Sequence, residues 1–189
     1  MIDLTRKTLP NTIEVYGRVF SIYTDFRVWI RFEIELAEHR GNDVMNLDYI
    51  FKNDRPMICP IQSLLEFARP KHEIPRPVRG TRDNVRVLDF RTDSDYIYAA
   101  FLQQYGIDLL EVPELHWHKF LALFNGLKGT KMDEIIGYRC YQKQSNRNKD
   151  FDPYEELREA WSLEYRLTAE EEEELEEFNR LSRGGDSKG

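Results

Sequence analysis

The 189-residue sequence has few of the features that mark a disulfide-rich, secreted or membrane-spanning protein. Its only two cysteines, Cys59 and Cys140, are far apart and belong to no pattern of spacings, which favours reduced thiols in a cytoplasm. The first residues have no apolar segment as long as that of a secretion signal, and no run approaches the roughly 20 apolar residues of a membrane span. We therefore expect a soluble protein that stays in the cytoplasm and does not bind membranes.

Catalytic and metal-binding patterns are also missing. The chain has no glycine-rich phosphate loop, no nucleophile elbow and no cysteine cluster. His116 and His118 are two residues apart, so on a helix their side chains point to nearly opposite sides and form no shared metal-binding face. Asp93 and Asp95 resemble the start of a calcium loop without its glycine and distal glutamate at the right spacing; helix capping explains them better. We expect a protein that is not an enzyme and that binds no cofactor and no metal.

Charge is distributed unevenly along the chain, whose formal net charge is −7. From Asp150 onward there are 14 acidic and 5 basic residues, a net of −9, which leaves 22 basic against 20 acidic residues, or +2, in residues 1–149. Because an acidic tail repels phosphate, nucleic acid is unfavoured as the main partner. A basic Pro- and Arg-rich loop at about residues 69–91 has two open interpretations. It is either a solvated loop, the commoner case, or a contact surface for an acidic partner such as the tail of a neighbouring copy.

The N-terminal third shows the signals of a hairpin followed by helices. Alternating apolar and polar residues over residues 13–23 predict two short strands that turn at Tyr16-Gly17. Thr24-Asp25 offers a cap for a helix that Gly41 ends. A short helical turn is expected at residues 48–51, and a further helix at residues 60–67.

The stretch from Asp93 to Tyr138 holds most of the uninterrupted apolar and aromatic residues and predicts three helices. Asp93 is expected to cap the first, Pro113 to open the second, and Thr130 with Asp133 to form a capping box for the third. The second helix is apolar around most of its circumference, which is typical of a buried central helix. The expected inner faces of the first and third helices consist of Tyr98, Phe101, Leu102 and Tyr105, and of Met132, Ile135, Ile136 and Cys140.

A polar break at residues 144–149 separates this body from an acidic tail. Asp152-Pro153 begins a helix, and Thr168 begins a second one that Gly184-Gly185 ends in a disordered terminus. The expected fold is mainly α. It consists of a compact helical body with a small N-terminal β-hairpin (residues 1–143) and a C-terminal acidic helical extension (residues 144–189).

Two segments, residues 13–33 and 93–127, resemble the bacteriophage gene-product-fifteen protein family of tailed phages and prophages of Gram-positive bacteria. The likeness covers most of residues 1–143. The resemblance implies a tail assembly chaperone for long, non-contractile tails, which binds the tape measure protein, recruits the major tail tube protein and self-associates. It also implies that the protein acts in the host cell cytoplasm and is absent from the mature virion. The family offers no catalytic residues to carry over.

A chaperone of this kind needs apolar surface on a movable element, with charge that keeps it soluble. The first tail helix fits, because it carries Tyr154, Leu157, Trp161 and Tyr165 on one face and is flanked by acidic residues. We interpret these four as candidate partner-binding residues that either latch onto the body or bind a partner. The first alternative is a structural neck or tail completion component of the virion. A less favoured one is a nucleic-acid-binding accessory protein that uses the basic loop.

Overall fold

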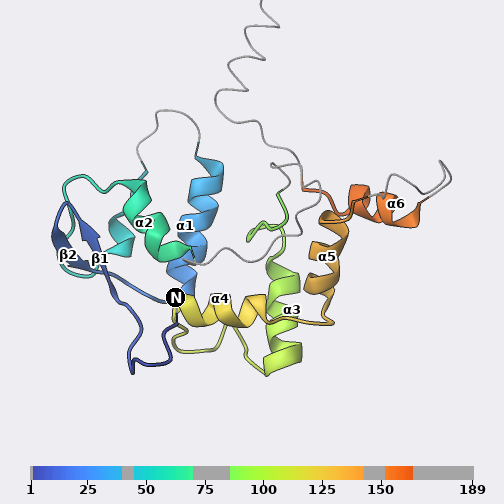
Figure 1. Ribbon diagram of the computed structural model, residues 1–189, viewed down its shortest axis with the longest axis horizontal. Coiled ribbons are helices and arrows are strands. Elements are labelled where there is room, and N and C mark those ends of the chain that lie inside the picture. The colour runs from blue at the N-terminus through green and yellow to red at the C-terminus, as the bar shows by residue number, and fades with distance from the viewer. Residues whose placement is uncertain (1, 40–44, 70–85, 143–151, 164–189) are drawn as a thin grey trace, which may run out of the picture.

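The protein is mainly helical in this computed structural model, which describes residues 2–39, 45–69, 86–142 and 152–163 (Figure 1). The expected fold class, with its N-terminal hairpin, is confirmed. The predicted helix from Thr168 lies outside the described residues. In chain order the elements are β1 (Thr12–Val15), β2 (Arg18–Ser21), α1 (Phe26–Glu38), the 3-10 helix η1 (Asp48–Ile50), α2 (Ile61–Ala68), α3 (Ser94–Tyr105), α4 (Trp117–Asn125), α5 (Lys131–Arg139) and α6 (Pro153–Ala160).

The hairpin forms where the alternation predicts it. Tyr16 and Gly17 both have positive φ, at 50° and 75°, as a two-residue turn between twisted antiparallel strands requires. β1 and β2 pair with Ile13 opposite Phe20, and both of these side chains are buried. The hairpin therefore contributes one apolar face to the core.

The start of α1 is tied to the start of α4. Asp25 caps α1 as predicted, because its Oδ1 accepts a hydrogen bond from the Arg27 backbone N–H at 3.0 Å. Its Oδ2 accepts from the Leu115 N–H at 3.2 Å, and the Phe26 N–H donates to the Leu115 carbonyl at 2.9 Å. Residues 89 and 90 positions apart in sequence are thus held together by one backbone–backbone bond and one bond to the Asp25 carboxylate.

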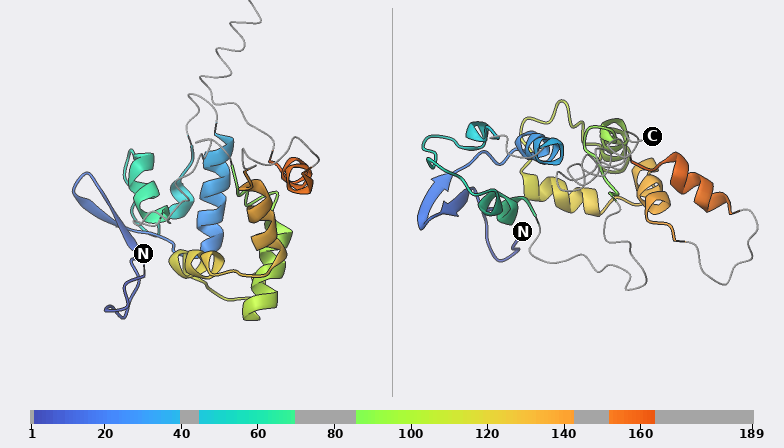
Figure 2. Two further views of the ribbon diagram at one scale, coloured as in Figure 1. Left: turned by 45° about the vertical axis from the view of Figure 1, so that its right-hand side comes forward. Right: turned by 90° about the horizontal axis from the view of Figure 1, so that it is seen from above.

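Helix α4 is the central helix, as its all-round apolar pattern predicts, and it crosses between α1 and α3 in the views of Figures 1 and 2. Phe120 is fully buried and lies between Phe26 of α1 and Phe101 of α3, with both ring centroids 5.0 Å away at interplanar angles of 9°. Each of these aromatic pairs adds about 0.5–1.5 kcal/mol to the free energy gained from area burial. The stack joins the N-terminal half of the fold to the C-terminal half.

The prediction that Pro113 opens this helix is wrong. The helix begins at Trp117 with His116 as its N-cap, and Pro113 lies in the connection that follows α3. A turn organised by Asp108, whose Oδ1 accepts from the Leu110 N–H at 2.8 Å, occupies part of this connection. The Arg27 guanidinium donates to the Leu109 carbonyl at 2.8 Å, which fixes the connection against α1.

Two predicted inner faces also need correction. In α3 the buried residues are Ile97, Ala100 and Phe101, while Leu102 is 45% exposed. Phe101 of the predicted face is buried against Phe120 of α4, and Tyr98 and Tyr105 pack against the core, so Leu102 is the misplaced residue. At the end of α5, Cys140 is exposed and Arg139 is the buried residue instead.

Arg139 is buried because it pairs with Asp93. The guanidinium donates to the two carboxylate oxygens at 2.7 and 2.8 Å, and the two side chains are only 3% and 1% exposed. Asp93 occupies the N-cap position of α3, but its carboxylate caps no helix N–H, so the expected capping role is wrong. It accepts instead from Arg139 and from the Asp89 N–H, at 2.9 Å.

We predict that Asp93→Asn lowers the free energy of unfolding by about 3–5 kcal/mol, because it leaves a buried guanidinium without its counter-charge. Urea denaturation followed by circular dichroism measures the change. The matched control is Asp54→Asn, which breaks the exposed Arg18–Asp54 pair and should cost under about 1 kcal/mol. Equal costs for the two variants would contradict the importance of the buried pair.

Candidate partner-binding surface

Helix α6 lies at the end of the molecule opposite the hairpin, beyond α5 (Figures 1 and 2). It begins where the sequence predicts, since the Asp152 side chain accepts from the Tyr154 N–H at 3.1 Å and Pro153 occupies its first turn. Glu155 and Glu156 in that turn complement the positive end of the helix dipole. None of the residues in α6 is buried, so the helix is docked on the surface of the body.

Trp161, directly after α6, contacts three residues of the body. Its ring meets the Tyr96 ring edge to face at 5.6 Å, and Lys131 Nζ lies 5.2 Å from its ring centroid. The Arg139 Nε–H donates to the Trp161 backbone carbonyl at 2.7 Å. We call Tyr96, Lys131 and Arg139 the Trp161 cradle.

The other candidate residues are less enclosed. Tyr154 is 51% exposed and stacks on Tyr141 with centroids 5.3 Å apart. The Tyr141 hydroxyl donates to Asp152 Oδ2 at 2.6 Å. Leu157 is half-buried, and Tyr165 lies outside the described residues. The structure thus brings Tyr154 and Trp161 against the body through two separate aromatic contacts.

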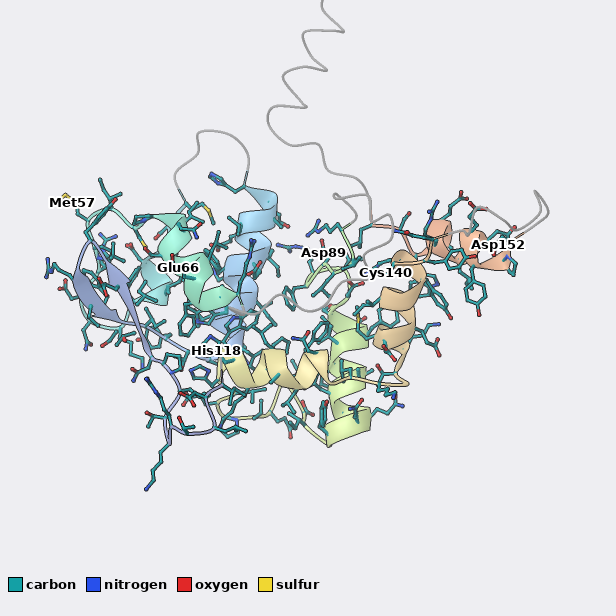
Figure 3. All side chains as sticks on the ribbon, viewed as in Figure 1. Met57, Glu66, Asp89, His118, Cys140 and Asp152 are labelled. Atoms are coloured by element: carbon teal, nitrogen blue, oxygen red, sulfur yellow. The ribbon has the colours of Figure 1, made fainter. Side chains whose placement is uncertain are left out.

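A second group of exposed apolar residues, not predicted from the sequence, lies at the hairpin end. It comprises Tyr16, Val19, Met57 and Ile58, and Met57 is fully exposed; Figure 3 shows it beside the hairpin. The connection that carries Met57 and Ile58 is bound to β2 by the hydrogen bond from the Lys52 N–H to the Ser21 carbonyl, at 3.0 Å. The sequence signal that could have predicted this exposed group is the presence of Met57 and Ile58 in a connection bounded by Pro56 and Pro60.

At the described C-terminal end of the basic segment, Arg86 and Arg91 have internal partners. Arg86 pairs with Asp89 at 2.6 Å, and Arg91 donates to both carboxylate oxygens of Glu38, at 2.9 and 3.2 Å. Residues 70–85 of the predicted basic loop lie outside the described residues. A phosphate that bound Arg86 or Arg91 would have to displace a carboxylate.

His116 and His118 do not point to opposite sides, and that expectation is wrong. Because His116 precedes the helix in an extended conformation, its ring centroid lies 5.1 Å from that of His118. His116 Nδ1 accepts from the His118 N–H at 3.1 Å, so its protonated Nε2 donates to the Pro10 carbonyl at 2.9 Å. His118 Nε2 donates to the Phe67 carbonyl at 2.8 Å. Burial lowers the pKa of both rings, that of His118 to about 4.

Through these hydrogen bonds the two histidines connect the start of α4 to Pro10 and to the end of α2. Within the residues described, no three His, Cys, Asp or Glu side chains are grouped closely enough to hold a metal ion. The two cysteines are free, with Cys59 half-buried. No helix in the described ranges is long and apolar enough to cross a membrane.

The geometry defines a mainly helical protein whose surface bears a docked amphipathic helix and exposed apolar residues at its two ends. The model of one family, described as Bacteriophage Gp15 protein, matches residues 5–163, and the chain belongs to this family. Membership indicates a phage structural or morphogenesis protein. The match extends beyond residues 1–143, where the resemblance was seen, and takes in α6. Comparison with curated proteins and with solved structures finds no match.

We predict that stability falls as the pH drops from 7.5 to 5, in part because His118 must stay neutral when folded. A folded pKa of about 4 against an ordinary value near 6.5 means that the unfolded chain binds more protons in this window, so acid favours unfolding. The histidine alone should cost up to about 2 kcal/mol by pH 5. Urea midpoints across the window measure this loss.

His118→Gln keeps an N–H donor for the Phe67 carbonyl and should show a shallower pH dependence than the unaltered protein. His39→Gln, at a histidine that lies at the end of α1, is the matched control and should keep the original slope. Identical slopes in all three proteins would exclude His118 as a cause of acid sensitivity.

Proposed function

We propose that this protein is a non-catalytic tail assembly chaperone. It binds the tape measure protein of its phage and recruits major tail tube subunits in the host cell cytoplasm, and it is absent from the mature virion. The observation that carries the proposal is the surface-docked α6, which has no buried residue and exposes 51% of Tyr154, in a chain whose family is assigned to phage structure or morphogenesis.

Physical chemistry supports a client of this kind. The family resemblance implies a tape measure protein that is long and helical, and amphipathic helices are recognised by apolar and aromatic side chains that enter their apolar stripe. Helix α6 has no buried residue, so its exchange from the body to a client would uncover little core surface. The acidic residues on α6 and in the tail that follows would keep the unladen protein soluble.

The rival is a structural neck or tail completion component, which belongs to the same broad class of phage proteins. It differs in one observable respect, since a component stays in the particle and a chaperone leaves. A nucleic-acid-binding role has less support, because Arg86 and Arg91 already face carboxylates. Mass spectrometry of purified virions separates the first two, and salt-dependent retention on DNA would favour the third.

We predict that this protein, co-expressed with the tape measure protein of the same phage, captures it in a soluble multi-copy complex. A pull-down through a tag on this protein, followed by light scattering, measures the capture. The double variant Tyr154→Ala/Trp161→Ala should reduce capture at least about tenfold, because about 1.4 kcal/mol lost at the interface has that effect.

Tyr23→Ala is the matched control, since Tyr23 is a tyrosine of similar exposure, 46% against 51% for Tyr154, that lies next to the hairpin. It should capture the tape measure protein normally. An insoluble tape measure protein beside a freely eluting partner would contradict the proposal, as would the presence of this protein in finished virions.

A further inference from the structure

We propose that α6 is an exchangeable element, and that the Trp161 cradle of one copy accepts α6 and Trp161 of a second copy. The occupant of the site is therefore this chain itself, in cis or in trans. The inference concerns self-association and does not depend on the identity of any client.

The cradle is held in place without help from α6. Arg139 is fixed by Asp93 through two hydrogen bonds and by the Val87 carbonyl at 3.1 Å, none of which involves α6. Lys131 is held by Glu134 at 3.0 Å. When α6 leaves, these groups keep their positions, so a second α6 meets a preformed site and loses less entropy on binding.

The helix that fills the cradle buries none of its own residues. Its described ties to the body include the contacts of Trp161, the stack of Tyr154 on Tyr141 and the hydrogen bond from the Tyr141 hydroxyl to Asp152. An element without buried apolar residues opens at low free-energy cost. Departure from its own body is therefore far easier for α6 than for α3 or α4, which carry core residues.

The chemistry of the site and of its occupant is complementary. Arg139 donates to the carbonyl at the C-terminal end of α6, the end at which a helix dipole favours a cation. Lys131 covers the Trp161 ring in a cation–π contact. The same fit is available to the α6 of any copy.

The connection to the body is nine residues long. Residues 143–151 separate the described body from Asp152, and any chain of nine residues spans at most about 30 Å. Helix α6 also lies at one end of the molecule, where a neighbour can approach it (Figure 2). Exchange of a terminal element between identical chains is a low-cost route to oligomers.

A complementation experiment with two full-length variants tests the proposal. The acceptor, Trp161→Ala, has an intact cradle and a defective α6. The donor, Tyr96→Ala/Lys131→Glu, has an intact α6 and a defective cradle. Each carries a different tag, and circular dichroism establishes that both fold; should the donor not fold, Lys131→Glu alone replaces it.

Donor and acceptor should form a mixed complex of twice the 22.6 kDa chain mass in light scattering, recovered through either tag. At the same concentration, acceptor with differently tagged acceptor and donor with donor should show at least about tenfold less pairing, equivalent to 1.4 kcal/mol. Failure of donor and acceptor to pair overturns the proposal. So does equal pairing in all three mixtures, since Trp161 and the cradle would then be dispensable.

Discussion

The buried ion pair between Arg139 and Asp93 is the constraint on which the C-terminal half of this protein depends. Neither charge can be left alone in a site where the side chains are 3% and 1% exposed without a cost of several kcal/mol. The pair therefore fixes the end of α5 against the start of α3. Because the same guanidinium also binds the carbonyls of Val87 and Trp161, it sets the position of the chain that enters α3 and of the helix docked outside α5.

The N-terminal half is joined to this unit through α4. Phe120 stacks between rings from α1 and α3. Side chains in the first turn of α4 bind carbonyl groups near the C-terminal end of α2. The carbonyls of Phe67 and Ala68, near the C-terminal end of α2, accept hydrogen bonds from His118 and from the Trp117 indole N–H, the latter at 2.7 Å. Groups that the end of a helix leaves unsatisfied are thus bound by side chains of the central helix.

Sequence signals with short range predicted the structure well, and those that depend on distant partners did not. The Tyr16-Gly17 turn and the Asp25, Thr130 and Asp152 caps were found because each relies on residues within a few positions. Asp93 was assigned a capping role from its position before an apolar stretch. Its ion pair could not be predicted, because the partner Arg139 lies 46 residues away. Leu102 was wrongly assigned to the inner face of α3 because the sequence of this helix is apolar on more than one side. Within the candidate site, Tyr154 and Trp161 could be predicted from their spacing on one helix. Tyr96, Lys131 and Arg139 could not, because they lie in two other helices and form no common sequence pattern.

One detail of the docked helix bears on how this family can diverge. Arg139 binds the backbone carbonyl of Trp161, a group that every amino acid possesses. A point mutation at this position can remove the ring but not the carbonyl. An insertion or deletion within α6 would instead move the helix end away from the guanidinium. Selection on this contact should therefore act on the length of the segment more strictly than on its composition, and homologous chains can drift in sequence here while they conserve the spacing.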